Sequence, residues 1–286
     1  MLCAILLASG VPCLAEYPAI PPADLVRRTV HNEIRANADN AKYMFRDRKE
    51  TPSGSQTKLL VETREAMAGM VVADNDRPLN PEQRQAELNR VRRFVEDPAE
   101  LRRKQKQEQE TAEHMSRIIK ALPDAFIYEY DGTETGRAGV GCPGDELVRV
   151  KFHPNPSYDP PTRVEQVLTG MHGTLLIDSQ KQRIAQIDGT LAKDVSFGWG
   201  ILGHLDRGGH FLVEQADVGN NHWEIARMGL KFTGKVLFFK TINIQSTELF
   251  SDFRAVPSNL TFAQGVDLLE KEGATLAQGS QQAGKQ

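Results

Sequence analysis

Apolar and polar residues alternate in short runs through the second half of the chain, from Gly173 to Phe253. Segments rich in turn-forming residues, such as Asp206-Arg-Gly-Gly, separate these runs. Apolar runs bounded by Gly, Asn and Asp are typical of strands joined by hairpins. The pattern predicts a meander of antiparallel strands. Its last member is expected to be one long strand from Lys235, covered on both faces because apolar residues do not alternate near Phe238.

Period-2 alternation also occurs in the first half of the chain. Tyr43 and Phe45 fall on one face of a short predicted strand. Residues two apart in a strand share a face, so register decides which set is buried. Two further predicted strands place six large side chains on one face, which we expect to be the concave face of the sheet: Phe126, Tyr128, Tyr130, Val148, Val150 and Phe152.

Helical periodicity marks three segments that precede the main meander. The first carries an apolar stripe at helical spacing, formed by Leu25, Val26, Val30, Ile34 and Ala38. Such a stripe is typical of an amphipathic helix that packs on another layer. Two more helices are expected over 81–95, with Asn80 as N-cap, and over 97–122. The charged stretch Arg102–Glu110 mixes both signs and predicts a solvated helical face rather than a nucleic-acid site.

Strands come first, helices interrupt them, and strands resume without a change of composition that would mark a second domain. This order predicts an α+β fold with helices segregated to one side of an antiparallel sheet. We expect a signal peptide over 1–15 and a single domain over 16–270 with a helical insertion at about 81–122. Gly, Gln, Ala and Lys dominate 271–286, which predicts a disordered tail.

The first fifteen residues form an apolar run that ends in small residues at Ala15. The run is too short to span a bilayer as a helix and is typical of a secretory signal peptide. We expect cleavage near Ala15, a periplasmic or secreted protein, and no transmembrane segment in the mature chain. A buried N-terminal helix and lipidation at Cys13 are the alternatives. No Lys or Arg precedes the run, so the start is expected to lie further upstream. Cleavage would remove Cys3 and Cys13 and leave Cys142 as a lone thiol.

Charge and motifs exclude some functions. A formal net charge of −3 over 286 residues gives no general attraction to nucleic acid. Gly198-Trp-Gly-Ile-Leu-Gly203 matches a dinucleotide motif, but the Gly-rich turn at Asp206 stands where that motif needs a helix. His204, Asp206 and His210 are close in sequence, yet turn and strand-end positions explain them as well as metal binding does. We expect no catalytic residue, no metal and no cofactor.

Three sequence segments resemble those of an uncharacterised bacterial exported family: Asn80-Pro-Glu-Gln-Arg, Ala121-Leu-Pro-Asp-Ala-Phe-Ile-Tyr-Glu-Tyr-Asp-Gly and Ala192-Lys-Asp-Val-Ser-Phe-Gly-Trp-Gly-Ile-Leu-Gly. The order of elements from about Asp24 to Phe253 also resembles the periplasmic lipoprotein-carrier superfamily, which includes the outer-membrane lipoprotein localisation factors. The resemblance implies a strongly curved, unclosed half-barrel with helices on its concave side and an apolar cavity between them. It carries over no functional residue position by position.

A curved sheet with one apolar face and movable helices can shield an acyl chain from water. We therefore expect a non-enzymatic binding or carrier protein for lipid, acyl chains or another amphiphile, with the first helix as a lid. The alternatives are an envelope structural or interaction protein whose cavity is self-filled, and a hydrolase, which no motif supports. The residues expected to line the cavity are Val30, Ile34, Tyr43, Phe45, Phe126, Tyr128, Val150, Phe152, Trp199 and Phe238.

Overall fold

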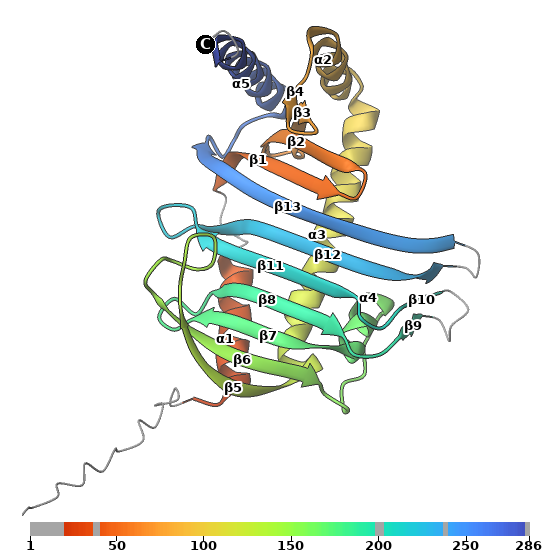
Figure 1. The fold of residues 1–286 in the computed structure, drawn as a ribbon, viewed down its shortest axis with the longest axis vertical. Helices are drawn as coiled ribbons and strands as arrows, with labels where there is room; N and C mark the ends of the chain where they lie inside the picture. The colour runs from red at the N-terminus through yellow and green to blue at the C-terminus, as the bar shows by residue number, and fades with distance from the viewer. Residues whose placement is uncertain (1–19, 37–40, 198–202, 237–239, 284–286) are drawn as a thin grey trace, which may run out of the picture.

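The computed structural model describes residues 20–36, 41–197, 203–236 and 240–283 (Figure 1). Trp199, Phe238 and the expected signal peptide lie outside these ranges. Within them the helices are α1 (Pro22–Ala36), α2 (Pro81–Glu96), α3 (Pro98–Ala125), α4 (Arg163–Gln166) and α5 (Phe262–Ala283), with a short 3-10 helix, η1 (Val167–Gly170). The strands are β1 (Lys42–Thr51), β2 (Gly54–Val61), β3 (Ala68–Asp74), β4 (Arg77–Pro78), β5 (Phe126–Thr135), β6 (Glu146–Pro154), β7 (Met171–Asp178), β8 (Ile184–Leu191), β9 (Val195–Phe197), β10 (Gly203–Leu205), β11 (His210–Asp217), β12 (Trp223–Val236) and β13 (Lys240–Val256).

All the strands belong to one antiparallel sheet, in the order β4-β3-β2-β1-β13-β12-β11-β8-β7-β6-β5, with β10 paired to β12 and β9 to β10. The first and last strands of this order, β4 and β5, do not pair with each other, so the sheet stays open (Figure 1). The structure is therefore an α+β fold built on an unclosed half-barrel, as the sequence predicts. The N-terminal strands join the sheet through β1, whose partner is the C-terminal β13.

The prediction of one long strand from Lys235 is wrong. β12 ends at Val236 and β13 begins at Lys240, and these two residues face each other in an antiparallel pair. The chain therefore reverses between them. The intervening sequence is Leu-Phe-Phe, which contains none of the turn-forming residues that normally reveal a hairpin.

The predicted shared face of β5 and β6 is confirmed. Five of its residues are buried in one core cluster, and Tyr130 packs against that cluster: Phe126, Tyr128, Val148, Val150 and Phe152. The rings of Phe126 and Phe152 have their centroids 4.6 Å apart. Helix α1 and the C-terminal end of α3 contribute further side chains to this cluster, so both helices cover the same face. Figure 1 shows α1 and α3 behind the sheet in that view.

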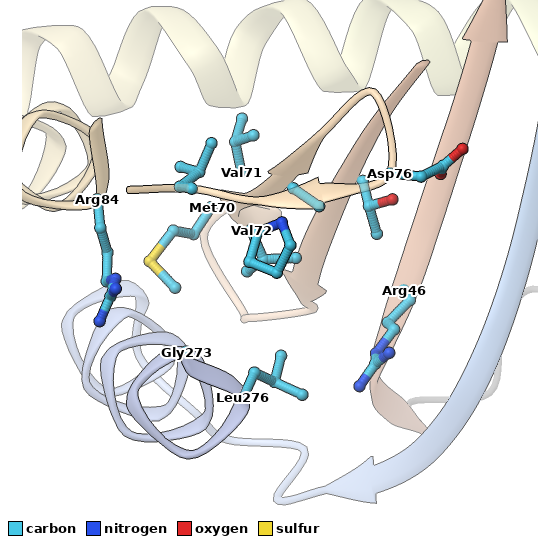
Figure 2. A pocket seen from close by; sticks show the side chains of 12 residues that line it. Arg46, Met70, Val71, Val72, Asp76, Arg84, Gly273 and Leu276 are labelled. Carbon is cyan, nitrogen blue, oxygen red and sulfur yellow. The ribbon is translucent and has the colours of Figure 1, made fainter. Parts of the chain in front are cut away.

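The helices do not all lie on one face. Helix α5 packs on Leu59, Val61 and Met70 in a second core cluster. In Figure 2 it lies on the opposite side of the β2–β3 strands from α3. Helix α5 continues to Ala283, into the tail expected to be disordered, and Gly273 is buried against Met70.

The helical insertion begins where local chemistry predicts. Asn80 accepts a hydrogen bond from the Gln83 backbone, and the Gln83 side chain accepts one from the Asn80 backbone, which makes a capping box. Asp97 caps α3 in turn. The expected end of α3 at 122 is three residues short, because the helix continues through Pro123 to Ala125.

Candidate functional site

The residues expected to line a cavity fall into two groups. Val30 packs in the core cluster with Phe126, Tyr128, Val150 and Phe152. Burial raises the pKa of Tyr128, and its hydroxyl donates a hydrogen bond of 2.6 Å to the carbonyl oxygen of Leu122. These side chains contact one another, so this part of the predicted lining forms packed core.

Tyr43 and Phe45 lie elsewhere on the sheet, against β13. Their rings pack on Phe253, with centroid distances of 6.2 Å and 5.1 Å. Ile34 is 38% exposed on α1 and belongs to neither group. Trp199 and Phe238 lie outside the described residues. The expected lining is therefore not brought together in one place.

Helix α1, the expected lid, is anchored by a buried ion pair. Arg183, which precedes β8, donates two hydrogen bonds of 2.9 Å and 3.1 Å to the carboxylate of Glu33. The backbone N–H of Ile184 donates a third to the same carboxylate. The two side chains are 11% and 4% exposed. Moving α1 away would separate the pair and leave a largely buried charge without its partner, which carries a penalty that apolar packing alone does not.

A groove between α5 and β3 is the best candidate for a ligand site (Figure 2). It has a volume of about 210 Å³. Its lining is largely apolar, with Met70, Val72, Leu79 and Leu276 among the contributors. A second cavity of about 260 Å³ continues along α5 toward α2 and shares Met70, Arg84 and Gly273 with the first. The two together form a channel beside α5, which we call the α5 groove.

Gly273 sets the distance between the helix and the sheet in the α5 groove. A Cβ atom at this position would lie 2.4 Å from the Cε of Met70. A separation below 3.0 Å is a clash, so any side chain here would push α5 away from β3 or displace Met70. The glycine therefore lets the helix approach the strand closely and keeps the groove narrow.

Two arginines approach the α5 groove from opposite sides, as Figure 2 shows for Arg84 and Arg46. Arg46 Nε lies 3.1 Å from Asp252 Oδ2. The guanidinium of Arg84 has no ion-pair partner among the described residues. Two carboxylates, Asp76 and Glu270, belong to the described lining. Arg48 binds Asp76 at 2.7 Å and 2.8 Å, and Arg92 binds Glu270 at 2.6 Å and 2.8 Å, which lowers the pKa of each carboxyl. The groove thus combines an apolar floor with positive charge.

The histidines do not form a metal site in the part of the chain that the structure describes. His204 Nε2 lies 3.2 Å from Asp206, and His210 Nε2 lies 2.9 Å from Asp188. Each imidazole thus has a carboxylate of its own. No group of three or more His, Cys, Asp or Glu side chains that could hold a metal occurs among the described residues. No described helix is long and apolar enough to cross a membrane.

Sequence reasoning missed the α5 groove because it treated 271–286 as disordered. The available signal was an apolar spacing across the proposed boundary: Val266, Leu269, Gly273 and Leu276 follow one another at intervals of three and four residues. Gly273 within this stretch and Gly279 just after it lowered the apparent helix propensity.

No known protein-family model matches the chain, and no curated protein is significantly similar to it in sequence. Among solved structures, the fold is similar to the crystal structure of a DUF1329 family protein from Desulfovibrio piger. The two share 8% sequence identity, with 82% of this chain and 94% of that chain covered, and the TM-score is 0.30. A likeness this distant carries no argument about function, and the fold assignment above stands on the strand pairing alone.

Proposed function

We propose that this protein is a non-enzymatic binding or carrier protein for an amphiphilic ligand with an apolar chain and an anionic head group. The observation that carries the proposal is the α5 groove, where Met70, Val72 and Leu276 form an apolar surface and Arg46 and Arg84 approach from opposite sides. The expected signal peptide over 1–15 supports a periplasmic or secreted location for this binding.

Two physical effects favour such a ligand. Burying an alkyl chain stabilises the complex by about 0.8 kcal/mol for each CH₂ group removed from water. A charge-assisted hydrogen bond from a guanidinium to a carboxylate or phosphate adds about 1.5–3 kcal/mol. Arg84 is suited to this role because it has no partner within the described residues. Ligand sites usually have about 300–1,000 Å³, so the ligand would occupy both cavities of the groove.

A fluorescent fatty acid titrated into the purified protein tests the proposal. Arg84→Gln should weaken binding about tenfold, since the loss of one charge-assisted hydrogen bond is worth about 1.4 kcal/mol or more. Arg93→Gln is the matched control, because Arg93 is exposed on the same helix and does not line the groove. Its affinity should stay within about twofold of the parent, a change well below 1 kcal/mol.

The methyl ester of the same probe separates the two contributions. It should bind parent and Arg84→Gln equally, because it lacks the anionic head group. If the parent does not bind the acid, or if Arg84→Gln and Arg93→Gln bind it equally well, the α5 groove is not a site for anionic amphiphiles.

A second candidate is an envelope structural or interaction protein with a self-filled interior. The packed core beneath α1 favours it, since the rings of Phe126 and Phe152 pack against each other there and Glu33 binds the helix to Arg183. Native mass spectrometry after gentle purification separates the two candidates. Co-purifying lipid supports a carrier, and a clean mass of the protein alone supports the structural protein.

A further inference from the structure

A second cavity, unlike the α5 groove, is lined mainly by polar groups. It has a volume of about 420 Å³ and lies beside the C-terminal end of α1 and the turn between β11 and β12. We call it the polar cavity. Its described lining residues come from the end of α1, the start of β1, the residues just after β2 and just before β8, the β11–β12 turn and the start of β12: Ala36, Ala41, Lys42, Glu62, Arg183, Asn220, Asn221, His222, Trp223 and Glu224. The volume is within the usual range for small-molecule sites.

Among the described residues that line the polar cavity, acidic groups outnumber free cations. Arg183 is already neutralised by Glu33, which accepts both of its hydrogen bonds. Two further carboxylates, Glu62 and Glu224, then remain in the described lining beside Lys42 and the imidazole of His222. Glu62 accepts a hydrogen bond of 2.9 Å from the backbone N–H of Tyr43. The side chain of Glu224 makes no hydrogen bond or ion pair with any residue that the structure describes.

An uncompensated carboxylate in a confined site takes up a proton or a cation. Burial, and next the charge of Glu62, raise the pKa of Glu224 to about 7, against the lowering effects of Arg183 and Lys42. Burial also raises the pKa of Glu62. The pair therefore holds a proton over part of the neutral range when the cavity contains no ligand.

Trp223 lines the same cavity and is only 6% exposed as a residue. Its indole Nε1–H has no acceptor among the described residues but is itself buried, so it is not reached from the cavity. The carboxylates of Glu62 and Glu224 are the acidic groups that a ligand in the cavity would meet. A ligand that offers donors to both of them would satisfy what these side chains leave open.

We infer that the polar cavity binds the primary ammonium group of a small polar amine, which takes the place of the proton held by Glu62 and Glu224. An ammonium has three donors, enough for both carboxylates and the side-chain carbonyl of Asn220 or Asn221. A metal ion fits less well, because the described residues contain no cluster of three or more acidic, His or Cys ligands. Lys42 already supplies a positive charge in the lining, so a single ammonium is favoured over a polyamine.

The exchange of a proton for an ammonium predicts a specific pH dependence. An amine with the basicity of a lysine stays charged through neutral pH. Below pH 7 the ligand must displace a proton from the pair, and above it the carboxylates are already free. With one proton linked and a pKa of about 7 for Glu224, affinity should rise about tenfold between pH 6 and pH 8.

Isothermal titration calorimetry of the full chain with ethanolamine, at pH 6 and pH 8, tests the inference. Titrations in buffers of different ionisation enthalpy should report proton release near pH 7 and none at pH 8.5. Ethylene glycol, which lacks the ammonium group, should not bind. Glu224→Gln should lose at least about tenfold in affinity at pH 8 and should bind independently of pH, because a charged hydrogen-bond partner has been removed.

Asp47→Asn is the matched control. Asp47 is another partly buried carboxyl whose pKa is raised by burial and next by Glu248, and it does not line the polar cavity. Its affinity and pH dependence should match the parent. Thermal unfolding identifies a variant that fails to fold, in which case Glu62→Gln replaces Glu224→Gln. Failure of ethanolamine to bind the parent, equal binding by Glu224→Gln, or equal affinity at pH 6 and pH 8 would each overturn the inference.

Discussion

Neutralising Glu33 should release α1 from the sheet and measure how firmly it is docked. Glu33→Gln keeps the shape of the side chain but removes the charge that Arg183 binds through two hydrogen bonds. The amide also has only one acceptor oxygen, so the donor groups of Arg183 and the Ile184 N–H then compete for it.

The size of the effect follows from burial and from the neighbours of Arg183. Breaking a buried ion pair by removing one partner typically costs about 3–5 kcal/mol, because the other charge stays buried. Arg183 keeps the Trp223 ring at 5.6 Å and faces Glu224 across the polar cavity. These contacts compensate part of the charge of Arg183. We therefore expect Glu33→Gln to lower the free energy of unfolding by about 3 kcal/mol, at the lower end of that range.

Urea unfolding followed by circular dichroism measures this loss. Arg27→Gln on the same helix is the control, since Arg27 pairs with Asp24 at 3.0 Å but both side chains are about half exposed, at 58% and 49%. Exposed pairs contribute about 0.2–1 kcal/mol. A Glu33→Gln loss no larger than that of Arg27→Gln would show that the ion pair does not hold α1, and the helix would again be a credible lid.

Two further changes test the cavity chemistry and the sheet. The raised pKa of Glu224, about 7, means that the protonated carboxyl favours the folded state, so the free energy of unfolding should fall by up to about 3 kcal/mol as pH rises from about 4.5 to about 7. Urea titrations at pH 5 and pH 7.5 should show this fall in the parent and a much smaller one in Glu224→Gln. An equal fall in the free energy of unfolding for both proteins would show that Glu224 is not the group responsible. Gly173→Ala would place a Cβ 1.9 Å from the carbonyl oxygen of Asp188 on β8, whereas a Cβ at Gly229 of β12 would meet Leu212 at 3.7 Å, an ordinary contact. We expect Gly173→Ala to lower the free energy of unfolding by about 1–3 kcal/mol or more, and Gly229→Ala to lower it much less. An unfolding midpoint for Gly173→Ala at or above that of Gly229→Ala would contradict the close approach of β7 and β8.

Local patterns predicted the faces of strands well and their partners poorly. Alternation placed Phe126, Tyr128 and Phe152 on one face, because a slip of one residue would have exposed all of them. Alternation carried no information on which strand lies beside β1. Its partner is β13, which ends at Val256 and is far from β1 along the chain. The candidate sites depend on the same long-range pairing, and no sequence signal connects Glu62 with Glu224.

Helix α5 shows a different limit. Its glycines weaken the helical pattern in the sequence, but the structure uses them where the helix approaches the sheet. A Cβ on Gly265 would lie 2.6 Å from Thr63 Cγ2, and one on Gly273 would lie 2.4 Å from Met70. The residues that made the segment read as disordered are thus those that allow it to pack. Propensity describes an isolated helix, and tertiary contact overrides it here.

The pairing of β1 with β13 has a consequence for synthesis. Lys42 of β1 faces Val256 of β13 in that pair. The free edge of β1, the first described strand to be synthesised, therefore stays uncovered until β13, the last described strand, has been made. Contacts this distant along the chain slow folding, because loop closure must precede any gain from the pairing. During synthesis, β1–β3 would present an unpaired edge that favours aggregation. A nascent chain that stops before β13 is complete should therefore depend on chaperones more strongly than the finished protein does.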